Sequence, residues 1–464
     1  MSFDFPASVV PGEYAIEPAA PKGSHDAKFP SFATIYPERD RYLTVDVVRY
    51  HGAEHMQRER ASMWHHTWTC AGRVSDLANV GSWFKFDLGA ESFIVVRSSK
   101  SKIQAFYNVC RHRGNQIVTG DFGKNQRFMC SFHGWQWHAD GKLALITDRS
   151  TFKPEALCAN TDLLGVQCDT WAGFVFINPD PNAPPLADFL AEIPTLMQAY
   201  QMEDMHIVKD VVIELDANWK VVLEAFIESY HLQVTHPQAK PFLDDVHYQI
   251  DILHNGHGRL QTTIGHPSPR EKDRQFLHPG LGYMVAEVGL DPKQFEGRAM
   301  EVRAAIAAAK RRPDNVFGLD YSAFTDSQLT DDWNYSIFPN MTFNTHPEGV
   351  LVMRFLPHPT NPEKSNYHVW VLCRHLAKGM RPPAYMGVEP EVDISGDVRP
   401  VKRYNLKSRP ELGEVLEQDI KNIEGVQRGL RSRSFDYNKY CEQEQRIMQL
   451  HAEMDRYFNR HPAA

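Results

Sequence analysis

Cys110-Arg111-His112 and Cys130-Ser131-Phe132-His133 are the two stretches that decide how this 464-residue chain is organised. Each stretch offers one thiol and one imidazole, ligands that suit zinc or iron–sulfur chemistry rather than calcium or magnesium. One kind of [2Fe–2S] centre has two Cys on one iron and two His on the other. We therefore expect Cys110 and Cys130 to hold one iron of such a centre, and His112 and His133 to hold the other.

A structural zinc site made of the same four residues is the alternative. Zinc fingers keep the Cys pair together and the His pair together, as C-x2-4-C followed by H-x3-5-H. Each half of the present motif instead mixes one Cys with one His, an order that favours the [2Fe–2S] centre. Gly114 and Gly134 follow the two stretches, and glycine allows the tight turns that leave space beside a cluster.

The length and composition describe a globular protein of two or more domains. The sequence has 42% hydrophobic and 23% charged residues, a net charge of −8 and no basic run, which argues against a nucleic-acid partner. No run of about eighteen apolar residues could cross a membrane, and residues 1–12 lack the pattern of a secretory signal. The 7 Cys are scattered rather than arranged as a disulfide framework, so we expect a cytoplasmic location.

Turn-forming residues divide the chain into three parts. Residues 1–38 are rich in Pro, Ala and Ser and are predicted to form an extended arm. Short runs of β-branched and aromatic residues follow, with a hairpin signal at Asp140-Gly141, so residues 39–180 are predicted to form an all-β domain. A Pro-rich linker begins at Asn178, and residues 181–464 are predicted to form a second domain.

Two further His, His231 and His236, come after a segment with helical spacing of apolar residues, Trp219 to Tyr230. Residues five apart on an ideal helix differ by roughly 140° in direction, so a regular helix would not direct both imidazoles at one ion. Pro237 disfavours helical geometry at His236. We therefore predict that the helix loosens between the two His and that both imidazoles converge. Two hydrogen-bonded surface His near a helix end are the alternative.

A third candidate ligand, Asp419, lies far along the chain. Residues 412–430 are predicted to form an amphipathic helix, and Asp419 falls within its apolar face. A carboxylate at such a position is costly unless it is paired or bound to a metal. Together with His231 and His236 it makes the 2-His-1-carboxylate set that holds non-haem Fe(II). A buried salt bridge to an arginine such as Arg428 is the alternative.

With both sets of residues in place, the chain resembles the large (α) subunit of Rieske-type aromatic-ring-hydroxylating oxygenases over most of residues 40–455. The motifs that carry the resemblance, besides the two Cys-His stretches, are Asn218-Trp219-Lys220, Glu228-Ser229-Tyr230-His231, His236-Pro237, Glu417-Gln418-Asp419 and Gln427-Arg428-Gly429-Leu430. The resemblance implies an α+β fold, in which an all-β Rieske domain precedes a helix-grip catalytic domain, an antiparallel sheet that wraps a long helix. It also implies a trimer, with or without a small β subunit, in which the cluster of one subunit faces the mononuclear iron of the next.

The resemblance gives a role to Glu228, the acidic residue that precedes the first iron-binding His. It implies that Glu228 bridges His231 to a cluster-binding His of the neighbouring subunit. Similar dioxygenases mostly carry Asp at this position, whereas some monooxygenases that act on less aromatic substrates carry Glu. One carboxylate can accept hydrogen bonds from two imidazole N–H groups and orient both rings. A solvated helix residue is the alternative for Glu228.

The activity that the resemblance implies is that of a terminal oxygenase component. Electrons from NAD(P)H, delivered by a reductase or ferredoxin, would reach the mononuclear Fe(II) through the cluster. O2 would then hydroxylate a small apolar substrate, and ring dihydroxylation of an aromatic compound is the first expectation. A monooxygenase or demethylase with the same two centres is the alternative that Glu228 favours, and a non-enzymatic Rieske electron carrier is the alternative of another class. The substrate pocket is expected to draw on Phe226 and on the runs Tyr335–Phe343 and Leu351–Phe355.

Overall fold

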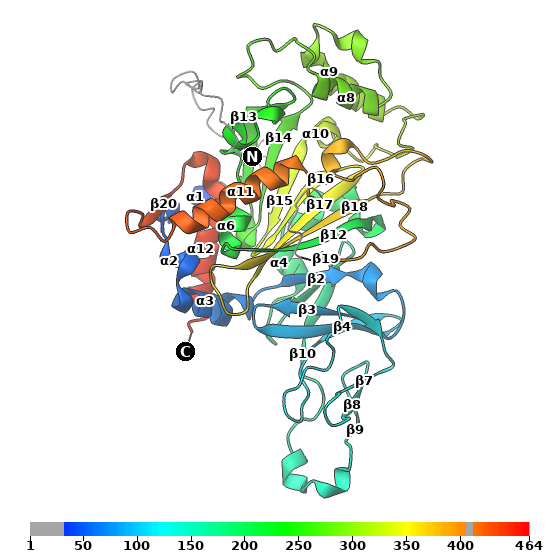
Figure 1. Cartoon of the computed structure of the whole chain (residues 1–464), viewed down its shortest axis with the longest axis vertical. Helices are drawn as coiled ribbons and strands as arrows, with labels where there is room; N and C mark the ends of the chain where they lie inside the picture. The colour runs from blue at the N-terminus through cyan, green and yellow to red at the C-terminus, as the bar shows by residue number, and fades with distance from the viewer. Residues whose placement is uncertain (1–31, 405–411, 464) are drawn as a thin grey trace.

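The structure is a computed structural model that describes residues 32–404 and 412–463 (Figure 1). Most of the predicted arm, residues 1–31, lies outside the described residues. The described end of the arm is packed rather than extended, because α1 (Phe32–Ile35) buries Phe32, and Tyr36 is buried after it. Within the described ranges, no helix is long and apolar enough to cross a membrane.

Two antiparallel sheets form the part of the chain that carries the Cys-His stretches. The larger sheet has the order β2-β11-β10-β5-β4-β3-β6 and the smaller has the order β7-β8-β9. Their strands are β2 (Thr69–Arg73), β3 (Ser82–Leu88), β4 (Glu91–Ser99), β5 (Lys102–Tyr107), β6 (Phe122–Lys124), β7 (Arg127–Met129), β8 (Gln136–His138), β9 (Leu143–Leu145), β10 (Gly165–Trp171) and β11 (Phe174–Asn178). The smaller sheet projects away from the rest of the molecule (Figure 1). The predicted β-rich first domain is therefore confirmed.

An eight-stranded sheet forms the second half of the molecule, in the order β13-β14-β15-β16-β17-β18-β12-β19. The strands are β12 (His206–Leu215), β13 (Leu243–Ile252), β14 (Gly258–Ile264), β15 (Asp332–Ile337), β16 (Met341–His346), β17 (Gly349–Pro357), β18 (Ser365–Cys373) and β19 (Arg403–Tyr404). Pairing is antiparallel except at the β12–β19 edge, where it is parallel. One face of this sheet packs on the first half of the chain, and Phe343 of β16 meets Phe174 of β11 edge to face at 5.5 Å.

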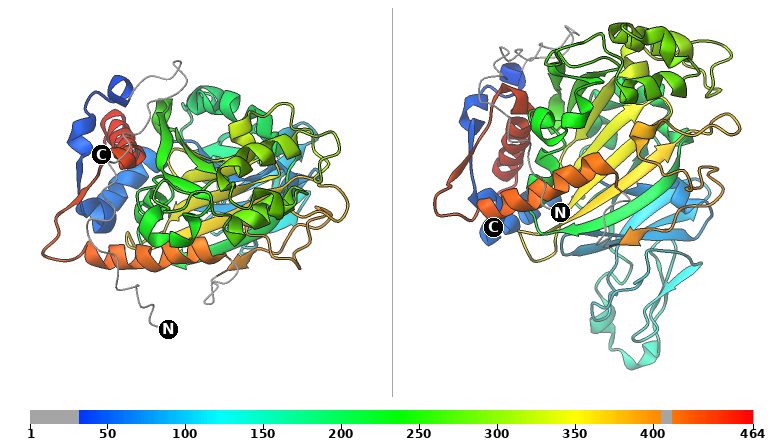
Figure 2. Two further views of the ribbon diagram at one scale, coloured as in Figure 1. Left: turned by 90° about the horizontal axis from the view of Figure 1, so that it is seen from above. Right: turned by 45° about the horizontal axis from the view of Figure 1, so that its top comes forward.

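Helices cover the opposite face of the eight-stranded sheet. The helix α11 (Glu414–Gly429), drawn in orange, crosses the sheet in front of its central strands (Figures 1 and 2). Beneath it, α6 (Trp219–Glu224) contacts β17 and β18, and α12 (Gln445–Arg460) contacts β13. The helix α7 (Leu232–Thr235) follows α6. The helices α4 (Leu186–Leu190), α5 (Ile193–Met197), α8 (Pro279–Glu287), α9 (Val302–Lys310) and α10 (Asp326–Thr330) instead contribute buried residues to the core that contains Phe174 and Phe343. A largely antiparallel sheet with a long helix across it is the helix-grip arrangement that the family resemblance implied.

The beginning and the end of the described chain lie side by side. The strand β1 (Thr44–Asp46) pairs with β20 (Tyr437–Lys439), and α2 (Val48–His51) and α3 (Ala53–Glu59) follow β1. Arg49 and Asp455 of α12 form an ion pair at 2.8 Å. Residues that precede the first sheet are thus held against the C-terminal helix.

Candidate metal centres and the adjoining cavity

The two Cys-His stretches lie on two loops with the same backbone hydrogen-bonding pattern. The N–H of Gly114 donates to the carbonyl oxygen of Cys110, and the N–H of Gly134 donates to that of Cys130, both at 3.0 Å. Both glycines have positive φ, 78° and 74°, a conformation that other residues rarely adopt. The tight turns expected at these glycines are therefore present.

The loops bring two thiols and two imidazoles together. Cys110 and Cys130 are buried and lie within hydrogen-bonding distance of one another, and the rings of His112 and His133 have centroids 4.6 Å apart. Nδ1 of His112 is buried and receives no hydrogen bond from the described residues. Burial raises the pKa of both thiols, and the pKa of Cys110 stays raised, whereas at Cys130 backbone N–H groups, the Cys110 thiol and the Asn115 amide outweigh burial and lower the pKa. This donor set fits a [2Fe–2S] cluster held by two Cys and two His.

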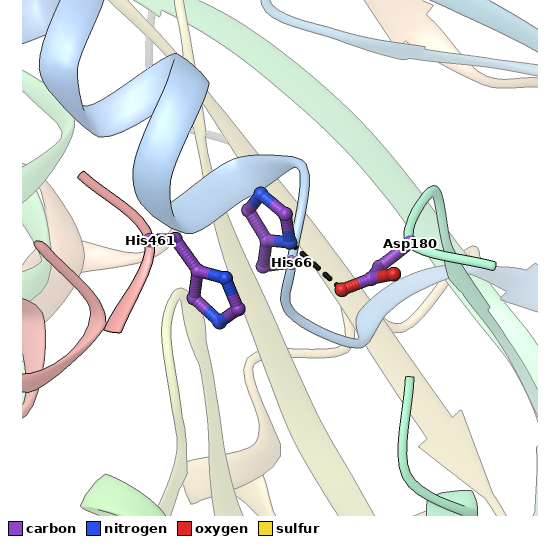
Figure 3. A group of neighbouring side chains, drawn as sticks. All are labelled: His66, Asp180 and His461. Atoms are coloured by element: carbon purple, nitrogen blue, oxygen red, sulfur yellow. Dashed lines mark hydrogen bonds and ion pairs between the residues drawn. The ribbon is translucent and has the colours of Figure 1, made fainter. Parts of the chain in front are cut away.

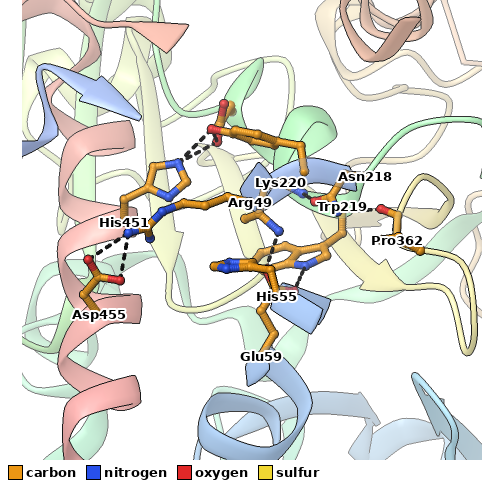
Figure 4. A network of polar contacts seen from close by, with 11 residues as sticks. Arg49, His55, Glu59, Asn218, Trp219, Lys220, Pro362, His451 and Asp455 are labelled. Atoms are coloured by element: carbon orange, nitrogen blue, oxygen red, sulfur yellow. Dashed lines mark hydrogen bonds and ion pairs between the residues drawn. The ribbon is translucent and has the colours of Figure 1, made fainter. Parts of the chain in front are cut away.

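A buried network fixes the helix that leads to the second site (Figure 4). Asn218 caps α6, because its side chain accepts a hydrogen bond from the N–H of Lys220 and donates one to the carbonyl oxygen of Pro362 at 2.6 Å. The ammonium of Lys220 pairs with Glu59, which also accepts a hydrogen bond from Trp219 Nε1 at 2.9 Å. Side chains on α6 and α3 thereby hold the start of α6 against the N-terminal segment.

The helix α6 ends earlier than its apolar spacing predicts. Helical spacing continues to Tyr230, but the helix stops at Glu224. The Glu228 carboxylate accepts hydrogen bonds from the backbone N–H groups of Tyr230 and His231, which a continuous helix would have directed at carbonyl oxygens. The backbone bonds of Phe226 and Ile227 have already tightened to the i→i−3 pattern before that point, so the helical spacing does not continue as helix to Tyr230.

The chain departs from helical geometry around, rather than between, the two His. A single helical turn, α7, lies between His231 and His236, and the helix is lost before His231 and at His236, where φ is −121° and ψ is 55°. The predicted loosening is therefore displaced by a few residues. Its expected consequence is nevertheless present, since the two imidazole rings face one another with centroids 5.1 Å apart.

Asp419 lies beside the two imidazoles and makes a group of three candidate ligands. Its Oδ1 atom lies 2.9 Å from Nε2 of His236 and 3.5 Å from Nε2 of His231. The carboxylate is 4% exposed and belongs to α11, whereas Arg428 of the same helix is exposed, so the alternative of a buried salt bridge between them does not apply. Two imidazoles and one carboxylate at these distances could hold one Fe(II).

Each imidazole of this group is oriented through its other nitrogen. Nδ1 of His231 is hydrogen-bonded to Glu228, and Nδ1 of His236 is hydrogen-bonded to Oε1 of Gln418 at 2.7 Å. Both Nε2 atoms therefore face Asp419, as metal ligation requires. Burial lowers the pKa of His231, but Glu228 and Asp419 raise it to about 9, so the surroundings favour a positive charge. Gln418 was not predicted, because a glutamine beside a ligand has no distinguishing sequence pattern.

A cavity of about 400 Å³ adjoins this second group. Of the predicted lining, Phe226, Leu351 and Met353 do face it. The run Tyr335–Phe343 was a wrong expectation: Phe343 packs on Phe174 on the other side of the sheet, and Tyr335 also belongs to the core on that side. Alternation along a strand sends neighbouring residues to opposite faces, so the residues on either side of that run line the cavity instead.

A third group of candidate ligands, His66, Asp180 and His461, lies where the two halves of the chain meet (Figure 3). Nδ1 of His66 is hydrogen-bonded to Asp180 at 2.8 Å. The rings of His66 and His461 are stacked, with centroids 3.8 Å apart and planes within 8° of parallel. Imidazole lone pairs lie in the ring plane, so two stacked rings do not point at one ion. This group is a structural contact.

Two protein-family models match this chain, one over its first half and one over its second half. The family model described as the ring hydroxylating alpha subunit (catalytic domain) matches residues 202–460, which is more than half of the chain. The chain belongs to this family. A second model, the Rieske [2Fe-2S] domain, matches residues 67–156 and includes all four residues of the Cys-His stretches.

Relatives of known activity fall into two groups. The carnitine monooxygenase oxygenase subunit of Escherichia coli (strain K12) is 30% identical over 241 residues, which cover 50% of this chain and 62% of that relative. The large oxygenase component of the 2,4-dinitrotoluene dioxygenase system of Burkholderia sp. (strain RASC) is 29% identical over 204 residues, 42% of this chain and 44% of the relative. The matches thus span less than two thirds of these relatives.

Two solved structures share the fold across most of the chain. A quaternary ammonium Rieske monooxygenase superposes with a TM-score of 0.62 at 20% identity, covering 89% of this chain and 95% of its own. Naphthalene 1,2-dioxygenase from Rhodococcus sp. superposes with a TM-score of 0.60 at 17% identity, covering 92% and 98%. Both solved structures therefore share the fold described above.

Proposed function

We propose that this protein is the terminal oxygenase component of a Rieske non-haem iron system that hydroxylates an apolar substrate with O2. The observation that carries the proposal is the convergence of His231, His236 and Asp419 beside an apolar cavity, in a chain that also brings two Cys and two His together. When bound, the mononuclear Fe(II) supplies open positions for O2, and the [2Fe–2S] cluster supplies single electrons. Cys110 and Cys130 would hold one cluster iron, and His112 and His133 the other.

The chain's own side chains prepare the site for that chemistry. Glu228 and Gln418 hold the two imidazoles in the tautomer that presents Nε2 to the metal. Phe226 lines the cavity, and behind it the rings of Phe355 and Tyr367 stack on it with centroids 5.6 and 5.3 Å away, which fixes its position. A cavity lined mostly by apolar groups excludes water and holds an apolar substrate.

The assembly and partners follow from the same proposal. Residues 39–180 would form the Rieske domain and residues 181–464 the catalytic domain. A trimer, with or without a β subunit, would place the cluster of one subunit next to Glu228 of its neighbour, and a reductase or ferredoxin would deliver electrons from NAD(P)H. Glu228 is hydrogen-bonded to His231 and its side chain is 9% exposed, which counts against the alternative of a solvated helix residue.

Two reaction outcomes remain as candidates. Ring dihydroxylation is the first, because the family includes dioxygenases of aromatic compounds and the cavity is apolar. Monooxygenation or demethylation is the second, and Glu228 together with the carnitine and glycine betaine monooxygenase relatives supports it.

Two measurements test the proposal. Iron analysis of the purified, cluster-loaded protein should give about three irons per chain, and about two would indicate an electron carrier instead. Product analysis by mass spectrometry under labelled O2 should give two labelled oxygens for dihydroxylation and one for monooxygenation. Absence of any labelled product from a panel of aromatic and alkylammonium compounds, with iron fully loaded and the protein reduced, would contradict the oxygenase function.

A further inference from the structure

A pair of glutamine side chains lies behind His236. Oε1 of Gln418 accepts a hydrogen bond from Nδ1 of His236 at 2.7 Å and a second one from Nε2 of Gln238 at 2.8 Å. In return, Nε2 of Gln418 donates to Oε1 of Gln238 at 3.4 Å. The two amides therefore form a reciprocal pair, and one oxygen of that pair also serves the imidazole.

Gln238 belongs both to the wall of the cavity and to the turn that follows His236. It lies in η8 (Pro237–Ala239), a 3-10 turn that begins directly after His236. Its side chain is half-buried and lines the cavity, whereas Gln418 lies on α11. The amide pair thus joins the segment that carries one candidate iron ligand to the helix that carries another, Asp419.

The orientation of the Gln418 amide decides whether it can serve His236. A His that binds a metal through Nε2 keeps its proton on Nδ1, so Nδ1 can only donate and needs an oxygen in front of it. The last torsion of a Gln side chain is broad and roughly two-fold, so the amide can turn over and exchange its oxygen for its nitrogen. A Gln418 amide that turned over would direct its NH2 group at Nδ1 of His236, and two donors would meet.

Gln238 opposes this reversal of Gln418. In the observed orientation each amide nitrogen faces the oxygen of the other amide. If Gln418 alone turned over, nitrogen would face nitrogen and oxygen would face oxygen, so both hydrogen bonds of the pair would be lost together with the one to His236. Without an amide at position 238, only the hydrogen bond to His236 would oppose the reversal.

We propose that Gln238 is a positioning residue for the mononuclear iron, because it fixes the amide of Gln418 with its oxygen toward His236 and thereby keeps Nε2 of His236 directed at the metal. The inference rests on the proposed function, since it takes His236 as an iron ligand. Gln238 acts through the direction of a neighbouring amide rather than through a hydrogen bond of its own to the imidazole.

An anaerobic Fe(II) titration of the whole chain against a competing chelator tests this role without turnover. The cluster is loaded and oxidised, and its absorbance serves as a measure of folding. Q238L removes the amide and should weaken Fe(II) binding about 2- to 10-fold, the effect of about one hydrogen bond. Q238E should weaken Fe(II) binding further, because its carboxylate places an oxygen against Oε1 of Gln418 and favours the reversed amide.

Replacing Gln418 by Glu separates orientation from packing. A carboxylate presents an oxygen to His236 whichever way it turns, so it leaves nothing for Gln238 to fix. Q238L should therefore weaken Fe(II) binding in the wild-type background and leave it unchanged in the Q418E background. A role of Gln238 in packing or folding alone would weaken Fe(II) binding equally in both backgrounds.

The matched control is Q233L. Gln233 is also half-buried and lies on α7 between the two His, but within the described ranges no hydrogen bond joins it to Gln418. Q233L should bind Fe(II) with wild-type affinity.

The possible outcomes separate this inference from the proposed function. Wild-type affinity in both Q238L and Q238E, or an equal loss from Q238L in the two backgrounds, would overturn the inference and leave the proposed function intact. A wild-type protein that holds about two irons and takes up no third would contradict the proposed function, and the inference with it.

Discussion

Replacing Gln418 tests whether orientation of His236 contributes to iron binding. Oε1 of Gln418 is the acceptor 2.7 Å from Nδ1 of His236, and His236 is 2% exposed, so water cannot easily take its place. Loss of one buried hydrogen bond of this kind costs about 1–3 kcal/mol. Because about 1.4 kcal/mol corresponds to a factor of ten, Q418A should weaken Fe(II) binding by about 5- to 150-fold. A loss of this size agrees with the decrease of about 10- to 100-fold in metal affinity that is typical when a residue that orients a metal-binding His is replaced.

The assay is an anaerobic Fe(II) titration against a competing chelator, with the absorbance of the cluster as an internal measure of folding. N422A is the matched control, because Asn422 is exposed one turn further along α11. Q418E keeps an acceptor and should retain most of the affinity. Wild-type affinity in Q418A, with an intact cluster spectrum, would refute the reasoning that Gln418 fixes His236.

Three other variants probe the two centres and the buried network beside them. D419A should leave about two irons per chain with an unchanged cluster spectrum, and about three irons would contradict its assignment as a ligand. E228Q should keep about three irons, since glutamine can still accept a hydrogen bond from His231. It should slow the reoxidation of the reduced cluster by O2 and substrate about tenfold or more in stopped-flow measurements. An unchanged rate of reoxidation would contradict the bridging role of Glu228. Burial raises the pKa of Glu224 to about 8 in the folded protein, whereas an unfolded Glu has a pKa of about 4.3. Between these two pH values the unfolded carboxyl ionises and the folded one stays protonated, so the free energy of unfolding of the wild type should fall as pH rises through this range. E224Q should lack this part of the pH dependence of Tm, and parallel Tm curves for both proteins would show that Glu224 does not titrate in this way.

The physical origin of the Glu224 effect is visible in its contacts. Tyr50 donates to one of its carboxylate oxygens at 2.8 Å and Tyr440 donates to the other at 3.1 Å, while His451 Nε2 lies 3.1 Å away. The nearest ammonium, that of Lys220, is paired with Glu59. Hydrogen bonds and Lys220 lower the pKa, but burial dominates and raises it.

The sequence alone was sufficient to predict those features that a single short segment of the chain forms by itself. Cys110 and His112, like Cys130 and His133, lie on a loop that the next glycine closes, so ligand spacing and turn chemistry could be read together. The position of Asp419 beside His231 and His236 agrees with the argument that a carboxylate within an apolar helical face needs a partner. The β-rich first half and the helix across an antiparallel sheet likewise followed from strand patterns and from the family motifs.

Tertiary structure decided what depends on pairing between distant segments. The Glu228 carboxylate captures the backbone N–H groups of Tyr230 and His231 beyond the end of α6, and propensity does not encode that competition. The role of Gln418 depends on how α11 lies over His236. The mixture of polar and apolar side chains around the cavity depends on strand register, which places Asp332 beside His346 and the apolar residues of β14 and β17 on either side of β15 and β16. Side-chain alternation along one strand fixes which of its residues share a face of the sheet. Only the pairing of strands in the folded sheet decides which residues of different strands become neighbours on that face.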